Sequence, residues 1–210
     1  MRFQCFNPGE PGPTDNGLLF LDSWLKPSAV GLEWGSGYST AWLARRVAHL
    51  TTIEDNLEWF DTVSRVLAGS NLGCKVDYRF IPCQLREQDE PDSHPYAEVT
   101  SGLGDKTLVF ALVNGNIRAT CFRNVLPKIE PGGLLILANA SRYVPHHIGG
   151  RVTTVQKSSA EPFSPAWAEL MCQLESWHSV FTTDGNSDTR FWVRPLRLDL
   201  YPDGERRRPT

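Results

Sequence analysis

Two glycines separated by one residue are the clearest chemical signal in this 210-residue chain, because they follow a short apolar run, residues 29–34, that is typical of a buried strand. A glycine-rich turn between a strand and a helix lets backbone N–H groups approach a ligand, and the helix N-terminus favours negative charge. The turn contains Gly35, Ser36 and Gly37, and Ser39 follows it. We therefore expect it to bind either a pyrophosphate or an amino-acid carboxylate.

Two carboxylates near this turn limit the kinds of ligand that it can bind. Glu33, at the end of the first predicted strand, would repel a pyrophosphate but suits a ligand that carries an ammonium group. Glu54 follows a second β-rich run, residues 50–53, and is placed to accept two hydrogen bonds from a ribose. The dinucleotide fingerprint needs a third glycine where this chain has Thr40, which disfavours NAD(P) without excluding it. These features together predict a nucleoside joined to an amino acid.

Short β-rich runs alternate with helical patterns along the chain, which indicates an α/β protein. Helices are predicted at residues 39–49, 59–67, 117–129 and 167–174, and further strands at 76–81, 107–113, 134–137, 179–183 and 190–194. Residues 131–133, Pro-Gly-Gly, are expected to end the third of these helices, and residues 86–95 to form a mobile polar connection.

The alternation predicts a Rossmann-like, doubly wound seven-stranded sheet that is mostly parallel and ends in an antiparallel C-terminal hairpin around residues 184–187. Its ligand crevice should lie at the carboxyl ends of the strands. We expect one domain over residues 1–210, with a peripheral N-terminal arm at 1–16 and a peripheral C-terminal tail at 196–210. The arm and the polar connection are candidates to close over the site.

Composition limits the partners. The formal net charge is −3 and the basic residues are scattered apart from Arg206–Arg208, so no nucleic-acid partner is expected. No apolar run approaches the roughly 20 residues of a membrane span, so no membrane partner is expected. The five cysteines show neither metal-ligand spacing nor a secreted disulfide pattern, which predicts a cytoplasmic protein without a metal. A homodimer is left open.

Residues 30–60, which contain the glycine turn and Ile53-Glu54-Asp55-Asn56, resemble the first two motifs of the class I S-adenosylmethionine-dependent methyltransferases, in their small-molecule branch. The resemblance continues through residues 113–118, 126–133 and 137–143 and extends to about Arg194. It implies S-adenosylmethionine as the cofactor.

The resemblance also assigns roles to individual residues. Gly35 and Gly37, with Ser36 and Ser39, would pass under the methionine moiety, and Glu33 would bind its amino group. Glu54 would bind the ribose. The remaining cofactor-binding positions would be on the adenosine side and at the end of the fourth strand, at Asp55, Asn56, Trp59 and Asn114.

Two departures from the family pattern bear on catalysis. Relatives have Asp where this chain has Asn114 and Ala138, and in catechol-type members those positions help to bind a divalent metal. Amides alone make a poor site for a hard cation, and an amide cannot act as a base. Asn114, Tyr143 and His146 are the candidate catalytic residues, and Asn139 and Arg142 the candidate contacts of the acceptor.

The expected activity is metal-independent O- or N-methylation of a small-molecule acceptor. Two alternatives remain: a protein that binds S-adenosylmethionine but has lost catalysis, which Asn114 and Ala138 suggest, and an NAD(P)-dependent oxidoreductase, which only the general architecture favours.

Overall fold

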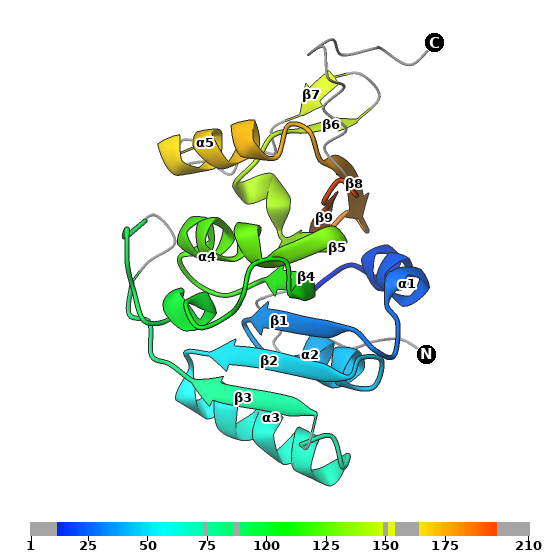
Figure 1. Cartoon of the computed structure of the whole chain (residues 1–210), viewed down its shortest axis with the longest axis vertical. Helices are drawn as coiled ribbons and strands as arrows, with labels where there is room; N and C mark the ends of the chain where they lie inside the picture. Colours follow the sequence, from blue (N-terminus) through cyan, green and yellow to red (C-terminus); the bar gives the residue numbers. More distant parts are fainter. Residues whose placement is uncertain (1–11, 74, 86–88, 149–150, 154–163, 197–210) are drawn as a thin grey trace.

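A twisted seven-stranded sheet crosses the computed structural model, which describes residues 12–73, 75–85, 89–148, 151–153 and 164–196 (Figure 1). Its strand order is β3-β2-β1-β4-β5-β9-β8. The first five of these strands are parallel, β9 is antiparallel to β5, and β8 is antiparallel to β9. The strands are β1 (Val30–Trp34), β2 (His49–Glu54), β3 (Val76–Phe80), β4 (Leu108–Val113), β5 (Ile129–Ala138), β8 (His178–Thr183) and β9 (Asp188–Val193). The predicted fold, including the closing hairpin, is confirmed.

Helices pack against both faces of the sheet, as a doubly wound fold requires. They are α1 (Asp15–Trp24), α2 (Tyr38–Ala44), α3 (Leu57–Gly69), α4 (Arg118–Val125) and α5 (Pro165–Gln173). One apolar cluster joins the sheet to α4 and α5, and a second joins it to α1 and α2. A third lies between α2 and α3.

Strand β4 shows why the sequence folds this way. Phe110 and Leu112 pack into the cluster of α1 and α2, whereas Ala111 and Val113 pack into the cluster of α4 and α5. A strand covered on both faces has no solvent-facing side, so its sequence is apolar almost throughout. The predicted central position of residues 107–113 is thus confirmed, and its carboxyl end lies beside that of β1.

Two predicted helix boundaries are wrong. The helix expected at 39–49 is α2, which ends at Ala44 because the chain must turn before β2 begins at His49. The helix expected at 117–129 consists of α4 followed by a 3₁₀ turn, η2 (Leu126–Lys128). Strand β5 already begins at Ile129, so Pro131-Gly132-Gly133 lies inside a strand and does not end a helix.

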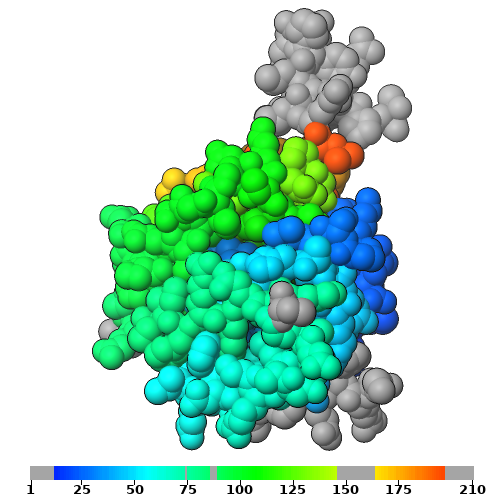
Figure 2. All heavy atoms as spheres, turned by 60° about the horizontal axis from the view of Figure 1, so that its bottom comes forward, coloured from blue at the N-terminus to red at the C-terminus, as the bar shows by residue number. Residues whose placement is uncertain are grey.

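Helix α1 was not predicted, since residues 1–16 were assigned to a peripheral arm and no element was assigned to residues 17–28. The side chain of Thr14 caps this helix by accepting a hydrogen bond from Gly17 N at 3.0 Å. Thr14 is 1 % exposed, and its hydroxyl lies 2.6 Å from that of Thr182 in β8. The end of the expected arm is therefore integral to the fold, and α1 packs against the body of the molecule (Figure 2). Residues 1–11 and 197–210 lie outside the described residues.

The segment between β3 and β4 is held in place where it is described. Pro91 O accepts hydrogen bonds from the side chains of Thr120 and Arg123, both in α4, at 2.8 and 3.1 Å. A short turn, η1 (Glu98–Thr100), follows it. Pro91 and Asp92 therefore contact α4, within the segment that was predicted to be a mobile connection, of which residues 86–88 lie outside the described part.

The segment after β5 forms a short turn and a small separate hairpin. A 3₁₀ turn, η3 (Ala140–Arg142), follows β5, and a separate hairpin, β6 (His146–Ile148) with β7 (Arg151–Thr153), comes next. Cys83, Cys121 and Cys172 are free thiols. Over the residues described, we find no helix with both the length and the apolar character to cross a membrane.

Candidate functional site

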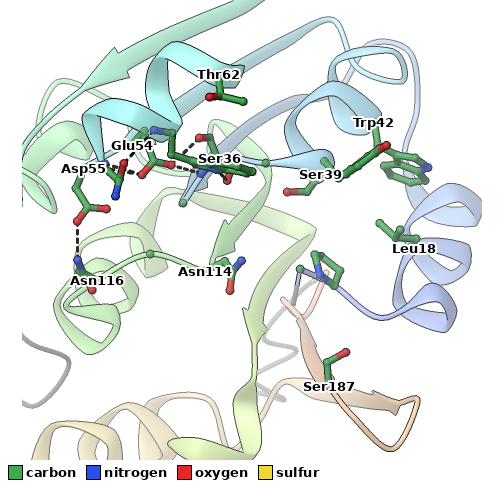
Figure 3. Close-up of a pocket in the computed structure, with 18 of the residues that line it drawn as sticks. Leu18, Ser36, Ser39, Trp42, Glu54, Asp55, Thr62, Asn114, Asn116 and Ser187 are labelled. Carbon is green, nitrogen blue, oxygen red and sulfur yellow. Dashed lines mark hydrogen bonds between the residues drawn. The ribbon is translucent and has the colours of Figure 1, made fainter. Parts of the chain in front are cut away.

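A cavity of about 620 Å³ lies at the carboxyl ends of β1, β2 and β4 (Figure 3). Its lining comes from the turn after β1, the start of α3, the loop after β4, the start of α1 and the β8–β9 turn. The crevice is where a doubly wound sheet is expected to bind ligands. The predicted site residues that line it are Gly35, Ser36, Gly37, Ser39, Glu54, Asp55, Asn56, Trp59 and Asn114.

The glycine turn approaches the neighbouring strand so closely that only glycine fits at its first position. Gly35 has φ +80°, and a Cβ there would lie 2.8 Å from the carbonyl oxygen of Asn114. Gly37 is different, since a Cβ there would meet nothing nearer than the Trp59 ring at 4.0 Å. Gly35 therefore shapes the turn, and Gly37 leaves open space beside the cavity.

Glu54 holds this turn. Its carboxylate accepts hydrogen bonds from Ser36 N at 2.9 Å, Ser36 Oγ at 2.5 Å, Asp55 N at 3.1 Å and Asn56 N at 2.9 Å. A carboxylate has about four acceptor positions, so a ribose hydroxyl requires one of these donors to leave. The Ser36 hydroxyl can do so, because it also lies 2.7 Å from the hydroxyl of Tyr78.

Glu33 has another role than the predicted one. Its carboxylate is completely buried and accepts hydrogen bonds from the hydroxyls of Ser39 at 2.5 Å, Thr40 at 2.7 Å and Thr52 at 3.1 Å. Burial raises the pKa of Glu33 to about 7, although these three hydrogen bonds oppose the rise. Glu33 does not line the cavity. It anchors the first turn of α2, and direct contact with a ligand ammonium is not supported.

Two hydrogen bonds connect the loops on the β2 side of the cavity. Asn116 Nδ2 donates to the carboxylate of Asp55 at 2.6 Å, which joins the loop after β4 to the loop after β2 (Figure 3). Trp59 Nε1 donates to the carbonyl of Ser36 at 2.7 Å, so α3 supports the glycine turn from the other side. Sequence reasoning missed Asn116, although it follows directly after the Asn114-Gly115 motif.

Sequence reasoning also missed the residues that line the opposite end of the cavity, away from Glu54 and Asp55. Leu18 of α1 and Trp42 of α2 line it together with Ser187 of the β8–β9 turn (Figure 3). Pro13, just before α1, also belongs to the lining. The turn was predicted as a hairpin loop, but nothing local in the sequence shows that β9 inserts beside β5 and carries this loop to the cavity.

A buried arginine stands behind the cavity. Arg118 is 2 % exposed, and its guanidinium donates to the carbonyls of Gly115 at 2.8 Å, Ala138 at 2.6 Å and Asn114 at 3.1 Å. It thereby connects the carboxyl ends of β4 and β5. The amide oxygen of Asn114 is buried, and no described residue donates a hydrogen bond to it.

Three of the candidate residues after β5, namely Asn139, Arg142 and Tyr143, do not line the cavity. Tyr143 is buried in the α4–α5 cluster, with ring centroids 5.4 Å from Trp167. Asn139 is 5 % exposed and Arg142 is exposed, and neither lines the cavity. His146 begins β6, and its side chain lies outside what the structure describes. The predicted catalytic role of Tyr143 and the acceptor contacts of Asn139 and Arg142 are therefore not supported, because none of the three lines the cavity.

The charged residues that line the cavity are all acidic among those that the structure describes. Among the described residues, its lining contains five carboxylates and no Lys, Arg or His; the five are Asp15, Glu54, Asp55, Glu58 and Asp184. Such a lining opposes an anionic ligand and suits a ligand with positive charge.

Comparison with solved structures finds proteins of the same architecture. No family model and no curated protein sequence matches the chain. Among solved structures it is similar to the O-methyltransferase TomG of Streptomyces achromogenes, solved with S-adenosylmethionine, at 18 % identity over 89 % of this chain and 83 % of the other, with a TM-score of 0.61. An O-methyltransferase of Bacillus cereus in complex with S-adenosylhomocysteine gives 18 % identity over 84 % and 78 %, with a TM-score of 0.59.

The same fold also serves another reaction. A precorrin 8w decarboxylase of Methanobacterium thermoautotrophicum matches with 18 % identity over 89 % of this chain and 94 % of the other, and a TM-score of 0.56. At these identities the similarity establishes architecture and leaves the reaction open. The chain has the Rossmann-like fold of the class I S-adenosylmethionine-dependent methyltransferases.

Proposed function

We propose that this protein binds S-adenosylmethionine in the cavity and transfers its methyl group to an oxygen or nitrogen atom of a small molecule, without a metal ion. The observation that carries the proposal is the meeting of the Gly35–Gly37 turn, Glu54 and Asn114 in one cavity at the carboxyl ends of three parallel strands. Two structural neighbours that contain the cofactor or its product support the choice of ligand.

The charge of the lining favours this cofactor over a nicotinamide dinucleotide. S-adenosylmethionine carries a sulfonium, an ammonium and one carboxylate, so its net charge is positive, whereas a dinucleotide carries two negative phosphates. Five carboxylates with no described basic residue among them attract the first and repel the second. The same charge argues against a nucleic-acid acceptor, because nucleic-acid binding depends on basic residues that contact phosphates.

The reaction balances without a bound metal. A lone pair on the acceptor forms a bond to the methyl carbon, the electron pair of the C–S bond goes to sulfur, and the acceptor loses its proton to solvent. The products are the methylated acceptor and S-adenosylhomocysteine. Holding two reactants in line contributes roughly 7–11 kcal/mol in good cases, so positioning by the cavity is a sufficient basis for catalysis. Asn114 is the lining residue that we assign to the reacting end.

Isothermal titration with S-adenosylmethionine, S-adenosylhomocysteine and NADH tests the proposal. We expect saturable binding of the first two and none of NADH. A screen of small-molecule acceptors, read out as S-adenosylhomocysteine formed, then separates an enzyme from a protein that binds the cofactor without turnover. Binding of NADH alone would refute the assignment.

A further inference from the structure

The side chains at the ends of β4 and β5 do not fit a divalent metal. The resemblance places a cation in catechol-type relatives at positions that are Asn114, Ala138 and Asn139 here, and none of these is a carboxylate. Hard cations need several oxygen ligands, usually with negative charge among them. Over the described residues, moreover, no three His, Cys, Asp or Glu side chains gather as a metal site would require.

A permanent cation already lies between these two strand ends. The guanidinium of Arg118 donates through Nε, Nη1 and Nη2 to three carbonyl oxygens, two from the loop after β4 and one from the last residue of β5. Those oxygens are engaged with a donor of positive charge. A second cation at this edge would meet both the occupied oxygens and the repulsion of a like charge.

The backbone on both sides of Arg118 adopts an unusual conformation. Ile117 has φ 39° and Asn139 has φ 52°, which places both in the left-handed region. A β-branched residue is rare there and persists only when its surroundings hold it. Arg118 donates to the carbonyl of Gly115, two residues before Ile117, and to the carbonyl of Ala138, directly before Asn139.

We propose that Arg118 replaces the metal of catechol-type relatives as the cation that joins the two strand ends on the acceptor side of the cavity. Arg118 does not line the cavity and is therefore a positioning residue. It fixes the loop that carries Asn114, a residue that lines the cavity and whose buried amide oxygen accepts no hydrogen bond from a described residue. The inference rests on the proposed function for its catalytic meaning, but the absence of a metal site is testable without it.

Binding of Mn²⁺, followed by electron paramagnetic resonance, tests the replacement. We expect no saturable binding to the unmodified protein up to about 1 mM. The variant Asn114→Asp/Ala138→Asp should also bind none, because Arg118 supplies the counter-charge for the new carboxylates. The triple variant, which combines Asn114→Asp and Ala138→Asp with Arg118→Met, should bind Mn²⁺ saturably because the competing positive charge is gone. Saturable Mn²⁺ binding by the unmodified protein that Asn114→Ala or Asn139→Ala abolishes would overturn the proposal.

Hydrogen exchange gives a second readout that does not depend on folding of the triple variant. With Arg118→Met, we expect amides in residues 114–117 and 139–143 to exchange about tenfold faster, while amides of β1 and β2 keep their rates. Arg123→Met is the matched control, since Arg123 lies on the same helix and contacts Pro91 and Asp92 in place of the strand ends. Unchanged exchange in both segments would refute the proposal.

The two hypotheses fail in different ways. If S-adenosylhomocysteine does not bind but Mn²⁺ binding and exchange behave as expected, the proposed function is wrong and the role of Arg118 at the strand ends stands.

Discussion

Replacement of Glu54 by Gln removes the group that we expect to bind the ribose, and it leaves the size of the side chain unchanged. Glu54 is 4 % exposed, and both of its oxygens already accept hydrogen bonds from the chain. The amide of Gln accepts through one oxygen only and presents an NH₂ group to the donors on its other side. The variant therefore weakens the glycine turn as well as the contact with the ligand.

The size of the effect follows from hydrogen bonds to a charged group, which contribute about 1.5–3 kcal/mol each. Loss of one such bond to a ribose hydroxyl raises the Kd for S-adenosylhomocysteine roughly 10- to 150-fold. Isothermal titration measures this directly, and a thermal melt without ligand shows how much of the change comes from the weakened turn.

Glu58→Gln is the control for this variant. Glu58 lines the same cavity but is exposed, so solvent and salt screen its charge. We expect its Kd to change by about twofold or less, since exposed charges interact weakly. If Glu54→Gln binds S-adenosylhomocysteine as tightly as the unmodified protein, or if both variants lose affinity equally, the assignment of Glu54 to the ribose is refuted.

Three further predictions concern the turn, the buried carboxylate and the metal. Gly35→Ala should destabilise the protein by about 1–3 kcal/mol in chemical denaturation because its Cβ meets the Asn114 carbonyl, whereas Gly37→Ala should leave stability nearly unchanged; equal losses would contradict this. The pKa of Glu33 rises from 4.5 to about 7 on folding, so the stability from its protonated form is complete below pH 4.5 and disappears as the pH rises through 7. In urea unfolding, the free energy of unfolding of the unmodified protein should fall by about 2–3 kcal/mol from pH 5 to pH 8, whereas that of Glu33→Gln should not. The same fall in both proteins would show that Glu33 is not the group responsible. EDTA should leave turnover with an identified acceptor unchanged. If EDTA abolished the activity and added Mg²⁺ restored it, the reaction would depend on a metal ion and the prediction would be wrong.

The part of the cavity formed by the glycine turn and Glu54 was predictable because its signals are local. The strand, the glycines and Glu54 lie within about 25 residues of sequence, and the carboxyl ends of parallel strands meet at one edge. The same reasoning located the sheet, because β4 is apolar throughout and the last two strands flank a turn sequence.

The end of the cavity formed by α1 and the β8–β9 turn was not predictable from local patterns. Ser187 reaches the cavity only because β9 inserts beside β5, and the start of α1 reaches it through contacts of Thr14 with β8 and β9. Glu33 looked like a ligand contact because its position at a strand end is visible in the sequence, whereas the three hydroxyls that surround it are not. Helix α1 did leave a signal, since Thr14 is an N-cap residue and Leu18 and Leu21 are spaced to face one side.

A crystal structure with S-adenosylhomocysteine is the most direct test of the central claim. We predict that the amino-acid part of the ligand lies over Gly35–Gly37, that its ribose hydroxyls bind the carboxylate of Glu54, and that the Ser36 hydroxyl has turned toward Tyr78. The sulfur should face Asn114, with no metal ion between the ends of β4 and β5. A ligand bound elsewhere, or one whose ribose lies away from Glu54, would contradict the account.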